Sequence, residues 1–249
     1  MEPVTLFSPP AQQGAGDQVA VIIPTFNEAE SIAAVIASIP RQTADRIIIV
    51  DGGSTDGTQQ RAAAAGAEVI GVGRGYGLAC FAGAQAAGAG DILVFMDGDG
   101  ADDPSAIAAL VAPIRAGTHD FVIASRARGD REPGSMGSHQ VLAGLAAGWL
   151  TKLLYGVRYT DMGPFRAIRR DTLMALGMRE MTYGWNLEMQ MRVARARLRV
   201  LEIPVSYRRR LGGDSKVSGN LRGTLKAGTR IFATFARVAT EPLRIREAS

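Results

Sequence analysis

The chain has 249 residues, of which 47% are apolar and 21% charged, a balance that is typical of globular proteins and excludes disorder as the main state. It is long enough for one large α/β domain or two small ones, and it contains no run of about 18 uncharged, strongly apolar residues that would predict a transmembrane helix. The charge is unevenly divided, because residues 1–124 carry 5 basic and 14 acidic side chains whereas residues 125–249 carry 23 basic and 10 acidic ones.

After a tail at residues 1–18 that is rich in Pro, Gln and Gly, the first half alternates short apolar runs with segments of helical spacing. The runs predict strands at Val19–Pro24, Arg46–Val50, Glu68–Val72, Asp91–Met96 and Phe121–Ser125. The intervening segments predict helices at Ala29–Ile39, Thr55–Gly66, Tyr76–Ala89 and Pro104–Arg115. Nearly continuous apolar strands that alternate with helices predict a mostly parallel sheet flanked by helices, with ligands at the carboxyl ends of the strands.

The second half is less regular and more basic. It predicts helices at Ser138–Tyr155 and Gly184–Arg197, a strand within Leu198–Tyr207, and two polar, Gly-containing loops at Arg126–Gly137 and Arg208–Gly219. No repeat or linker divides the chain, so we expect one domain over residues 19–220. Within it, a functional boundary is expected near residue 125, where the charge changes sign.

Several classes of site are excluded by single residue types. Cys80 is the only cysteine, so an internal disulfide or a cysteine-based zinc site cannot form, and a lone thiol fits a reducing compartment. His119 and His139 are the only histidines, which excludes a histidine-rich metal site. Aromatic residues make up only 6%, so we expect no stacking platform for single-stranded nucleic acid and no nucleic-acid partner.

The strongest candidate site is Asp97-Gly98-Asp99, directly after a predicted strand. Two carboxylates one residue apart can converge on a hard divalent cation, and the small Gly98 would let a ligand approach the backbone. The alternative is an ordinary turn in which the aspartates bond to their own backbone. The acidic first half suits a cation, whereas the basic second half suits phosphates, nucleic acid or an anionic membrane.

Two further polar clusters follow predicted strands. Pro24-Thr25-Phe26-Asn27-Glu28 ends the first, and Asp51-Gly-Gly-Ser-Thr-Asp-Gly-Thr58 follows the second, where the carboxylate of Asp51 could meet a ribose or a base. The glycines at 71, 73, 75 and 77 do not fit the spacing GxGxxG and follow the third strand, so we predict no NAD or FAD site.

These clusters occur in an order that resembles glycosyltransferase family 2, the inverting enzymes with the GT-A fold. The resemblance extends over about residues 19–220 and is greatest to the dolichyl- and polyprenyl-phosphate sugar synthase branch. The motifs that carry it are PTFNE (24–28), VDGGSTDGT (50–58), DGD (97–99), Ser125-Arg126, TDMGPFR (160–166), and Arg210 with GDSK (213–216). The chain departs from the family at Gly52, where Asp is usual, at Ala101, where Gln is frequent, and at His139, where the lipid-phosphate branch often has Arg.

The resemblance implies a donor half that extends to about residue 125, an acceptor half after it, and a role for each matching residue. Those expected to hold the nucleotide sugar are Pro24, Thr25, Glu28, Asp51, Asp97, Gly98, Arg166, Arg210 and Lys216. Asp97 and Asp99 would bind Mg²⁺ or Mn²⁺ against the diphosphate. Arg126, with Arg128 and Arg131 as substitutes for the family's second arginine, would face an acceptor phosphate. The residues expected at the reaction centre are Asp161, Arg126 and Glu188.

The implied reaction moves a hexose from a donor of the GDP-mannose or UDP-glucose type to an acceptor, with polyprenyl or dolichyl phosphate favoured. A lipid phosphate is already an anion at neutral pH, whereas a hydroxyl acceptor requires a base, for which Asp161 and Glu188 are the candidates. Glu188 could instead form a buried ion pair with Arg166 or Arg192. A sugar nucleotidyltransferase and a non-catalytic, basic membrane-surface module are the competing hypotheses.

The C-terminal segment bears on location. Leu221, Leu225, Phe232 and Phe235 can share one helical face, with basic residues around it, so a helix at Leu221–Val238 could lie in a membrane interface or pack on the domain. We therefore expect a cytoplasmic protein that visits the inner face of the membrane peripherally. A homo-oligomer is compatible with the sequence.

Overall fold

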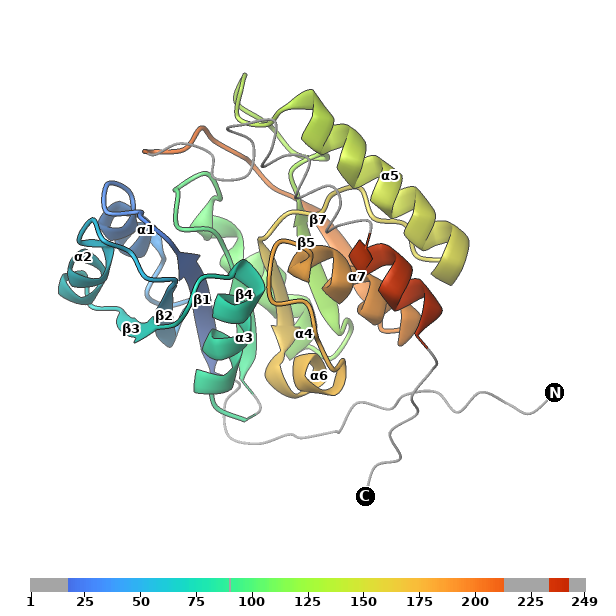
Figure 1. Cartoon of the computed structure of the whole chain (residues 1–249), viewed down its shortest axis with the longest axis horizontal. Helices are drawn as coiled ribbons and strands as arrows, with labels where there is room; N and C mark the ends of the chain where they lie inside the picture. The colour runs from blue at the N-terminus through green and yellow to red at the C-terminus, as the bar shows by residue number, and fades with distance from the viewer. Residues whose placement is uncertain (1–17, 90, 213–232, 242–249) are drawn as a thin grey trace.

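The computed structural model describes residues 18–89, 91–212 and 233–241, which form a sheet covered by helices on both faces (Figure 1). The elements in chain order are β1 (Val19–Thr25), α1 (Ile32–Ser38), β2 (Arg46–Asp51), α2 (Thr58–Ala64), β3 (Glu68–Gly71), α3 (Tyr76–Ala86), β4 (Ile92–Phe95), the 3₁₀ helix η1 (Pro104–Ala106), α4 (Ile107–Arg115), β5 (Phe121–Ser125), α5 (Ser138–Tyr155), β6 (Arg166–Arg169), α6 (Arg170–Ala175), α7 (Trp185–Arg195) and β7 (Val200–Pro204).

The seven strands lie in the order β3-β2-β1-β4-β6-β5-β7, and all pairings are parallel except those of β6 with β4 and β5. The mostly parallel sheet expected from the sequence is therefore confirmed. The chain runs outward from β1 to β3 and then returns to place β4 on the other side of β1. Ligands of such sheets bind at the carboxyl ends of the strands where the order reverses, here at the ends of β1 and β4.

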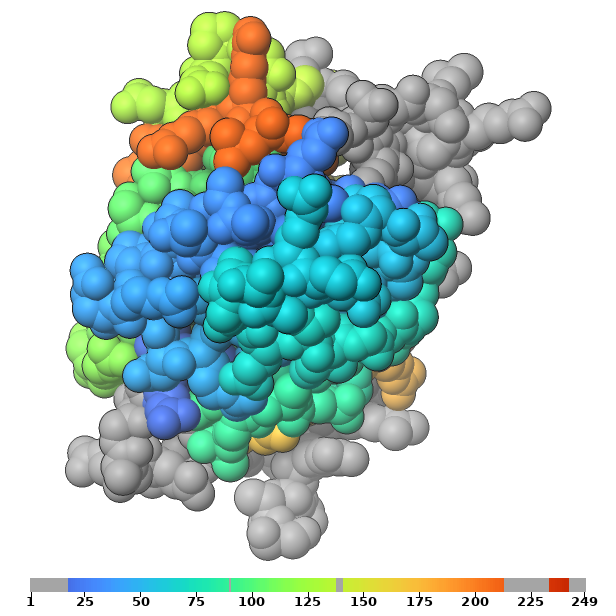
Figure 2. Space-filling view, turned by 90° about the vertical axis from the view of Figure 1, so that its left-hand side faces the viewer, coloured from blue at the N-terminus to red at the C-terminus, as the bar shows by residue number. Residues whose placement is uncertain are grey.

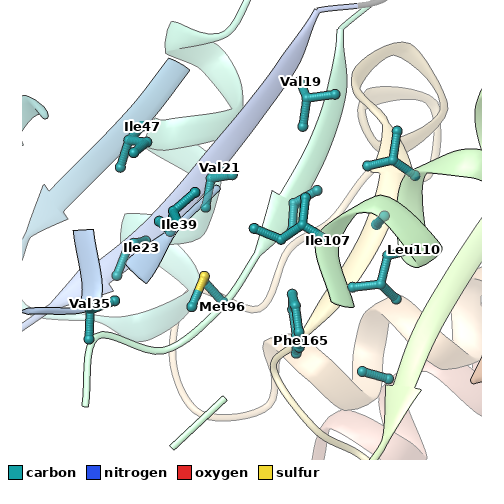
Figure 3. Close-up of a cluster of buried hydrophobic side chains, with 14 of the residues drawn as sticks. Val19, Val21, Ile23, Val35, Ile39, Ile47, Met96, Ile107, Leu110 and Phe165 are labelled. Atoms are coloured by element: carbon teal, nitrogen blue, oxygen red, sulfur yellow. The ribbon is translucent and has the colours of Figure 1, made fainter. Parts of the chain in front are cut away.

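Two apolar layers hold the helices to the sheet. Alternate residues of β1 point to opposite faces, as strand geometry requires: Val21 packs with α1 and α4 on one face, and Ile22 packs with α3 and α7 on the other. Figure 3 shows the first layer, in which Ile107 and Leu110 of α4 approach the sheet beside Phe165. Helices cover both faces of the sheet, and for this reason its strands are continuous apolar runs in the sequence.

The antiparallel strand β6 and the short helix α6 were not expected from the sequence. β6 is the segment Arg-Ala-Ile-Arg, in which Phe95 of β4 and Ile123 of β5 both pair with Arg166. A four-residue strand with a charged residue at each end contains no apolar run that would predict it. It is recognised only from its pairing with β4 and β5. α2 also begins at Thr58 rather than at Thr55, because the preceding residues form a loop.

Outside this sandwich, α5 packs on α7, and so does the described part of the C-terminal segment. Residues 233–240 are helical, and the buried Val238 lies in an apolar cluster with Ala147 of α5 and Leu187 of α7. Arg195 of α7 donates a hydrogen bond to the carbonyl of Val238 at 2.8 Å. Packing on the domain is thus confirmed for these residues, whereas the tail at residues 1–17 and the first part of the expected helix, to Phe232, lie outside the described residues. Nowhere in the described ranges is there a helix with the length and apolarity to cross a bilayer.

The contact of α5 with the domain makes Gly148→Ala strongly destabilising. A Cβ at Gly148 would lie 1.8 Å from the carbonyl oxygen of Tyr159, whereas a Cβ at Gly144 would lie 3.7 Å from its nearest neighbour, an ordinary contact. We expect Gly148→Ala to lower the free energy of unfolding by about 2 kcal/mol or more and Gly144→Ala to be neutral or slightly stabilising. Urea unfolding of both variants measures the difference, and equal stability of the two would contradict the packing of α5.

Candidate active site

The loops after β1 and β2 are joined by hydrogen bonds. Ser54 Oγ accepts the backbone N–H of Asn27 at 2.8 Å, and Thr58 Oγ1 accepts that of Glu28 at 2.8 Å. In return, Asn27 Oδ1 accepts the N–H of Thr55 at 3.0 Å. Asn27 has a left-handed φ of 53°, a conformation that asparagine tolerates better than most residues. The two motifs after β1 and β2 therefore form one rigid rim at the carboxyl end of the sheet.

The buried carboxylate of Asp51 holds this rim together by accepting hydrogen bonds. Its Oδ1 accepts hydrogen bonds from the N–H groups of Gly53 and Ser54 and from Gln59, and its Oδ2 accepts one from Thr25. Burial alone would raise the pKa of Asp51, but these bonds outweigh it and hold the pKa below its ordinary value. Asp51 is fully buried, and the role expected for it toward a nucleoside stays a prediction. Thr25 is also buried, whereas Pro24 and Glu28 are partly exposed beside it.

The DGD motif follows β4 at the strand reversal, next to the end of β1. Asp97 is partly exposed, while Asp99 is buried and accepts the N–H of Ala101 at 2.9 Å. A Cβ at Gly98 would lie 3.1 Å from Thr25 Cγ2, so the absence of a side chain lets the loop pack on β1. The approach of a ligand to the backbone at Gly98 stays a prediction. Desolvation and the charges of Asp99 and Asp102 raise the pKa of Asp97 well above its ordinary value.

The segment after β7 lies across the DGD motif. The N–H of Leu211 donates to the carbonyl of Asp99 at 2.9 Å, and that of Arg208 donates to the carbonyl of Ala101 at 2.9 Å. Arg210 Nε lies 3.2 Å from Asp99 Oδ2. Figure 2 shows this segment, in orange, against the blue N-terminal part of the described chain. Arg210, predicted to contact the donor's phosphates, therefore lies beside the predicted metal ligands.

A third carboxylate, Asp102, was missed from the sequence. It is buried, its Oδ2 accepts the N–H of Asp97 at 3.1 Å, and its Oδ1 has no hydrogen-bond partner among the described residues. Burial and the charge of Asp99 raise the pKa of Asp102 to about 7. Its spacing from the motif, three residues after Asp99 and just before η1, was the available signal.

These carboxylates fit a cation that is bound together with phosphates. In the described ranges, no set of three or more His, Cys, Asp or Glu side chains is arranged to hold a metal ion by itself. Mg²⁺ sites that act on nucleotides commonly have only one or two carboxylates, with substrate phosphates as further ligands. Asp97 and Asp99, next to the unpartnered oxygen of Asp102, match that pattern.

Near the DGD motif, Arg126 and Asp161 form a bidentate ion pair. Arg126 Nε lies 2.7 Å from Asp161 Oδ2, Arg126 Nη2 lies 2.8 Å from Oδ1, and the N–H of Arg126 also donates to Oδ2. Burial would lower the pKa of Arg126 and raise that of Asp161, but the pairing reverses both, so each stays charged. The ring of Tyr207 lies under the guanidinium, 4.9 Å from its Cζ.

Two of the expected site residues are enclosed by protein. Glu188 is fully buried, and its Oε1 lies 2.9 Å from Arg192 Nε and 3.0 Å from Arg237 Nη1. Its Oε2 accepts the backbone N–H groups of Arg179 and Glu180. The ion pair with Arg192 is therefore confirmed, and Glu188 is not placed to act as a base. Arg166 is fully buried too and donates to the carbonyls of Pro164, Gly163 and Asn186, so it braces this segment instead of reaching a donor.

The remaining basic residues predicted for the site are only partly described by the structure. Arg128 and Arg131 are exposed on the loop after β5, and their role toward an acceptor phosphate stays a prediction. Lys216 and the side chain of His139 lie outside the described residues. Two of the four glycines rejected as a dinucleotide motif have a packing reason, because a Cβ at Gly75 would lie 2.6 Å from the carbonyl oxygen of Met181 and one at Gly77 2.4 Å from that of Glu180.

Comparison with known proteins agrees with this geometry. The model of the family described as Glycosyl transferase family 2 matches residues 20–177. An uncharacterized glycosyltransferase of Mycobacterium tuberculosis is 39% identical over 218 residues, which cover 86% of this chain and 95% of that protein. An undecaprenyl-phosphate mannosyltransferase of Micrococcus luteus is 31% identical over 226 residues, which cover 83% of this chain and 90% of that protein.

A solved structure matches the fold over nearly the whole chain. It is the glucosyl-3-phosphoglycerate synthase of Mycobacterium tuberculosis in complex with Mn²⁺, UDP-glucose and phosphoglyceric acid, with a TM-score of 0.73 and 25% identity, covering 91% of this chain and 81% of that one. The expected GT-A fold and the resemblance to the polyprenyl-phosphate sugar synthase branch are thereby confirmed, and the hypothesis of a non-catalytic module is wrong. The chain is a glycosyltransferase and belongs to glycosyl transferase family 2.

Proposed function

We propose that this enzyme transfers a hexose, with inversion, from a nucleoside-diphosphate sugar of the GDP-mannose or UDP-glucose type to a polyprenyl phosphate, with Mg²⁺ or Mn²⁺ as cofactor. Relatives named as an undecaprenyl-phosphate mannosyltransferase and a polyprenol monophosphomannose synthase support the acceptor class. Solved structures that contain Mn²⁺ and UDP-glucose support the donor class and the metal.

The observation that carries the proposal is the meeting of opposite charges at the strand reversal. Arg210 Nε lies 3.2 Å from Asp99 Oδ2, and the positive charges of Arg210 and Arg126 both oppose the rise in the pKa of Asp97. Such a site matches a diphosphate and its cation together, because the carboxylates hold the cation and the arginines hold phosphate oxygens.

Asp97 and Asp99 would hold the divalent cation, which, when bound, stabilises negative charge on the departing diphosphate. The exposed side of Arg210, whose side chain is 36% accessible, would face the same phosphates and exchange its ion pair with Asp99 for one with the donor. Preorganised positive charge of this kind acts where charge develops in the transition state.

The acceptor half supports a phosphate nucleophile. An acceptor phosphate oxygen attacks C1 of the sugar, the bond from C1 to the diphosphate oxygen breaks, and its electron pair leaves on the diphosphate. No proton has to be removed, since the acceptor is already an anion. This fits the state of both candidate bases, because Asp161 is held by Arg126 and Glu188 by Arg192.

A hydroxyl acceptor is the second candidate, favoured by the likeness to glucosyl-3-phosphoglycerate synthase. It requires a base, and Asp161 could serve only by leaving its pair with Arg126. A lipid acceptor, by contrast, requires the enzyme to visit a membrane surface, which the basic second half of the chain favours.

The donor is tested first by thermal unfolding of the full chain with GDP, UDP, dTDP and CDP, each with Mg²⁺, Mn²⁺ or EDTA. At about 100 times its dissociation constant a ligand stabilises by roughly 2.7 kcal/mol, so we expect a metal-dependent rise in Tm with one nucleotide. Transfer of labelled hexose to a short-chain prenyl phosphate and to phosphoglyceric acid then separates the two acceptors. No rise with any nucleotide, or transfer to phosphoglyceric acid alone, would contradict the proposal.

A further inference from the structure

Helix α5 presents a row of large apolar side chains to solvent. Leu142, Trp149, Leu150, Leu153 and Leu154 are 69%, 56%, 44%, 80% and 46% exposed. They are spaced at seven, eight, eleven and twelve residues from the first, so they share one face of the helix, which we call the outer face of α5. Figure 1 shows α5 along one edge of the molecule, with no other labelled element beyond it.

The inner side of the same helix is made of small residues. Gly144, Ala147, Gly148 and Thr151 are buried against the domain, and Gly148 touches the backbone of Tyr159. A helix that only covered a protein core would place its large apolar residues inward. The arrangement is reversed here, so the apolar residues of the outer face contribute little to the packing of the described residues and are exposed for contact with a partner.

Charge indicates which partner fits. The sequence from residue 133 to 160 contains no acidic residue, and its cations Lys152 and Arg158 are exposed. Lys152 Nζ lies 5.3 Å and Arg158 Cζ 5.4 Å from the ring centroid of Trp149. Tryptophan with flanking lysine or arginine is typical of segments at the level of lipid headgroups, where the ring lies among acyl chains and the cations meet phosphates.

We propose that the outer face of α5 inserts into the interface of an anionic lipid bilayer and so brings the enzyme to its lipid-phosphate acceptor. The role of this binding in reaching the acceptor rests on the proposed function, whereas the binding itself does not. The location relative to the site agrees, because α5 follows the loop that carries Arg126, Arg128 and Arg131. Its inner side lies on the segment from Tyr159 to Met162, which holds Asp161. A nonpolar insertion of this kind needs no membrane-spanning helix.

The two tryptophans make the binding visible. Trp185 is fully buried, whereas Trp149 is exposed on the outer face, so vesicles that take up α5 shift the emission of Trp149 to shorter wavelength. We expect the full chain to sediment with vesicles of phosphatidylcholine and phosphatidylglycerol, to bind pure phosphatidylcholine more weakly, and to show the shift only when it sediments. Trp149→Phe should sediment without the shift.

The decisive variant is Leu142→Glu with Leu153→Glu, which we expect to keep the fold, because it replaces two of the most exposed side chains of the outer face. It should bind anionic vesicles at least about tenfold more weakly, since each change removes a leucine from the apolar phase and adds a repelled charge. Ala64→Glu, on the exposed side of α2, adds the same charge elsewhere and should bind like the unmodified chain.

Failure of this surface is distinct from failure of the proposed reaction. With a water-soluble short-chain prenyl phosphate, the double variant should keep its transfer rate, whereas with an acceptor embedded in vesicles the rate should fall with binding. Equal vesicle binding by the double variant and the unmodified chain would overturn the proposal. The proposal would also be overturned if the unmodified chain did not bind vesicles but formed a dimer in light scattering, and if the double variant were monomeric. A second copy of the chain would then occupy the outer face of α5.

Discussion

Asp99→Asn is expected to lower the rate of sugar transfer by about 10²–10³-fold while the chain stays folded. Asn keeps the shape of the side chain and can still accept the N–H of Ala101, but it removes a negative charge from the predicted metal site. Arg210 also loses its ion pair with Asp99, so the balance that holds a cation and a diphosphate together is disturbed from both sides.

The measurement is the initial rate at saturating donor, together with the rise in Tm that the nucleotide and Mn²⁺ produce jointly. We expect Asp99→Asn to lose most of that joint rise. Asp103→Asn is a matched control, because Asp103 lies in the same loop but faces Ser105 and Arg208 instead of the carboxylate cluster. Full activity of Asp99→Asn, or an equal loss in Asp103→Asn, would show that the metal ligands are misassigned.

Asp161→Asn is expected to lower the free energy of unfolding by about 3 kcal/mol, which corresponds to a fall in Tm of roughly 6–12 °C. The variant leaves Arg126 mostly buried, with a side chain only 14% exposed, and without its counter-charge. Asp171→Asn is the control, since Asp171 is 34% exposed and lies 3.6 Å from Arg170, a surface pair that should contribute under about 1 kcal/mol.

The dependence on pH distinguishes this pair from a catalytic base. The pKa of Asp161 is held below its ordinary value of 3.8, so the pair's contribution to stability is fully present above about pH 4 and is lost as the pH falls through the lowered pKa. The stability gap between Asp161→Asn and the unmodified chain should therefore be constant from about pH 5 to pH 8 and narrow in acid. Unmodified stability in Asp161→Asn, combined with complete loss of transfer to a hydroxyl acceptor, would instead make Asp161 the base.

The sequence was sufficient for the parts of this protein that are encoded locally. Apolar runs placed five strands of the sheet at β1 to β5, and the polar clusters after them fell on the carboxyl edge because parallel strands all end there. The DGD motif was found because two carboxylates one residue apart after a strand are close whatever the rest of the chain does. Such features depend only on residues that are close in the sequence, and the order of these motifs was enough to predict the family.

The tertiary structure decided what each charged residue does. Asp161 and Glu188 are equally plausible bases in the sequence, yet one is held by Arg126, 35 residues away, and the other by Arg192 and Arg237. It also decided that β6 fills the space between β4 and β5, and that α5 turns its small residues inward and its leucines outward. These outcomes depend on which distant surfaces meet, because burial and pairing set the state of a charge, and no local pattern contains that information.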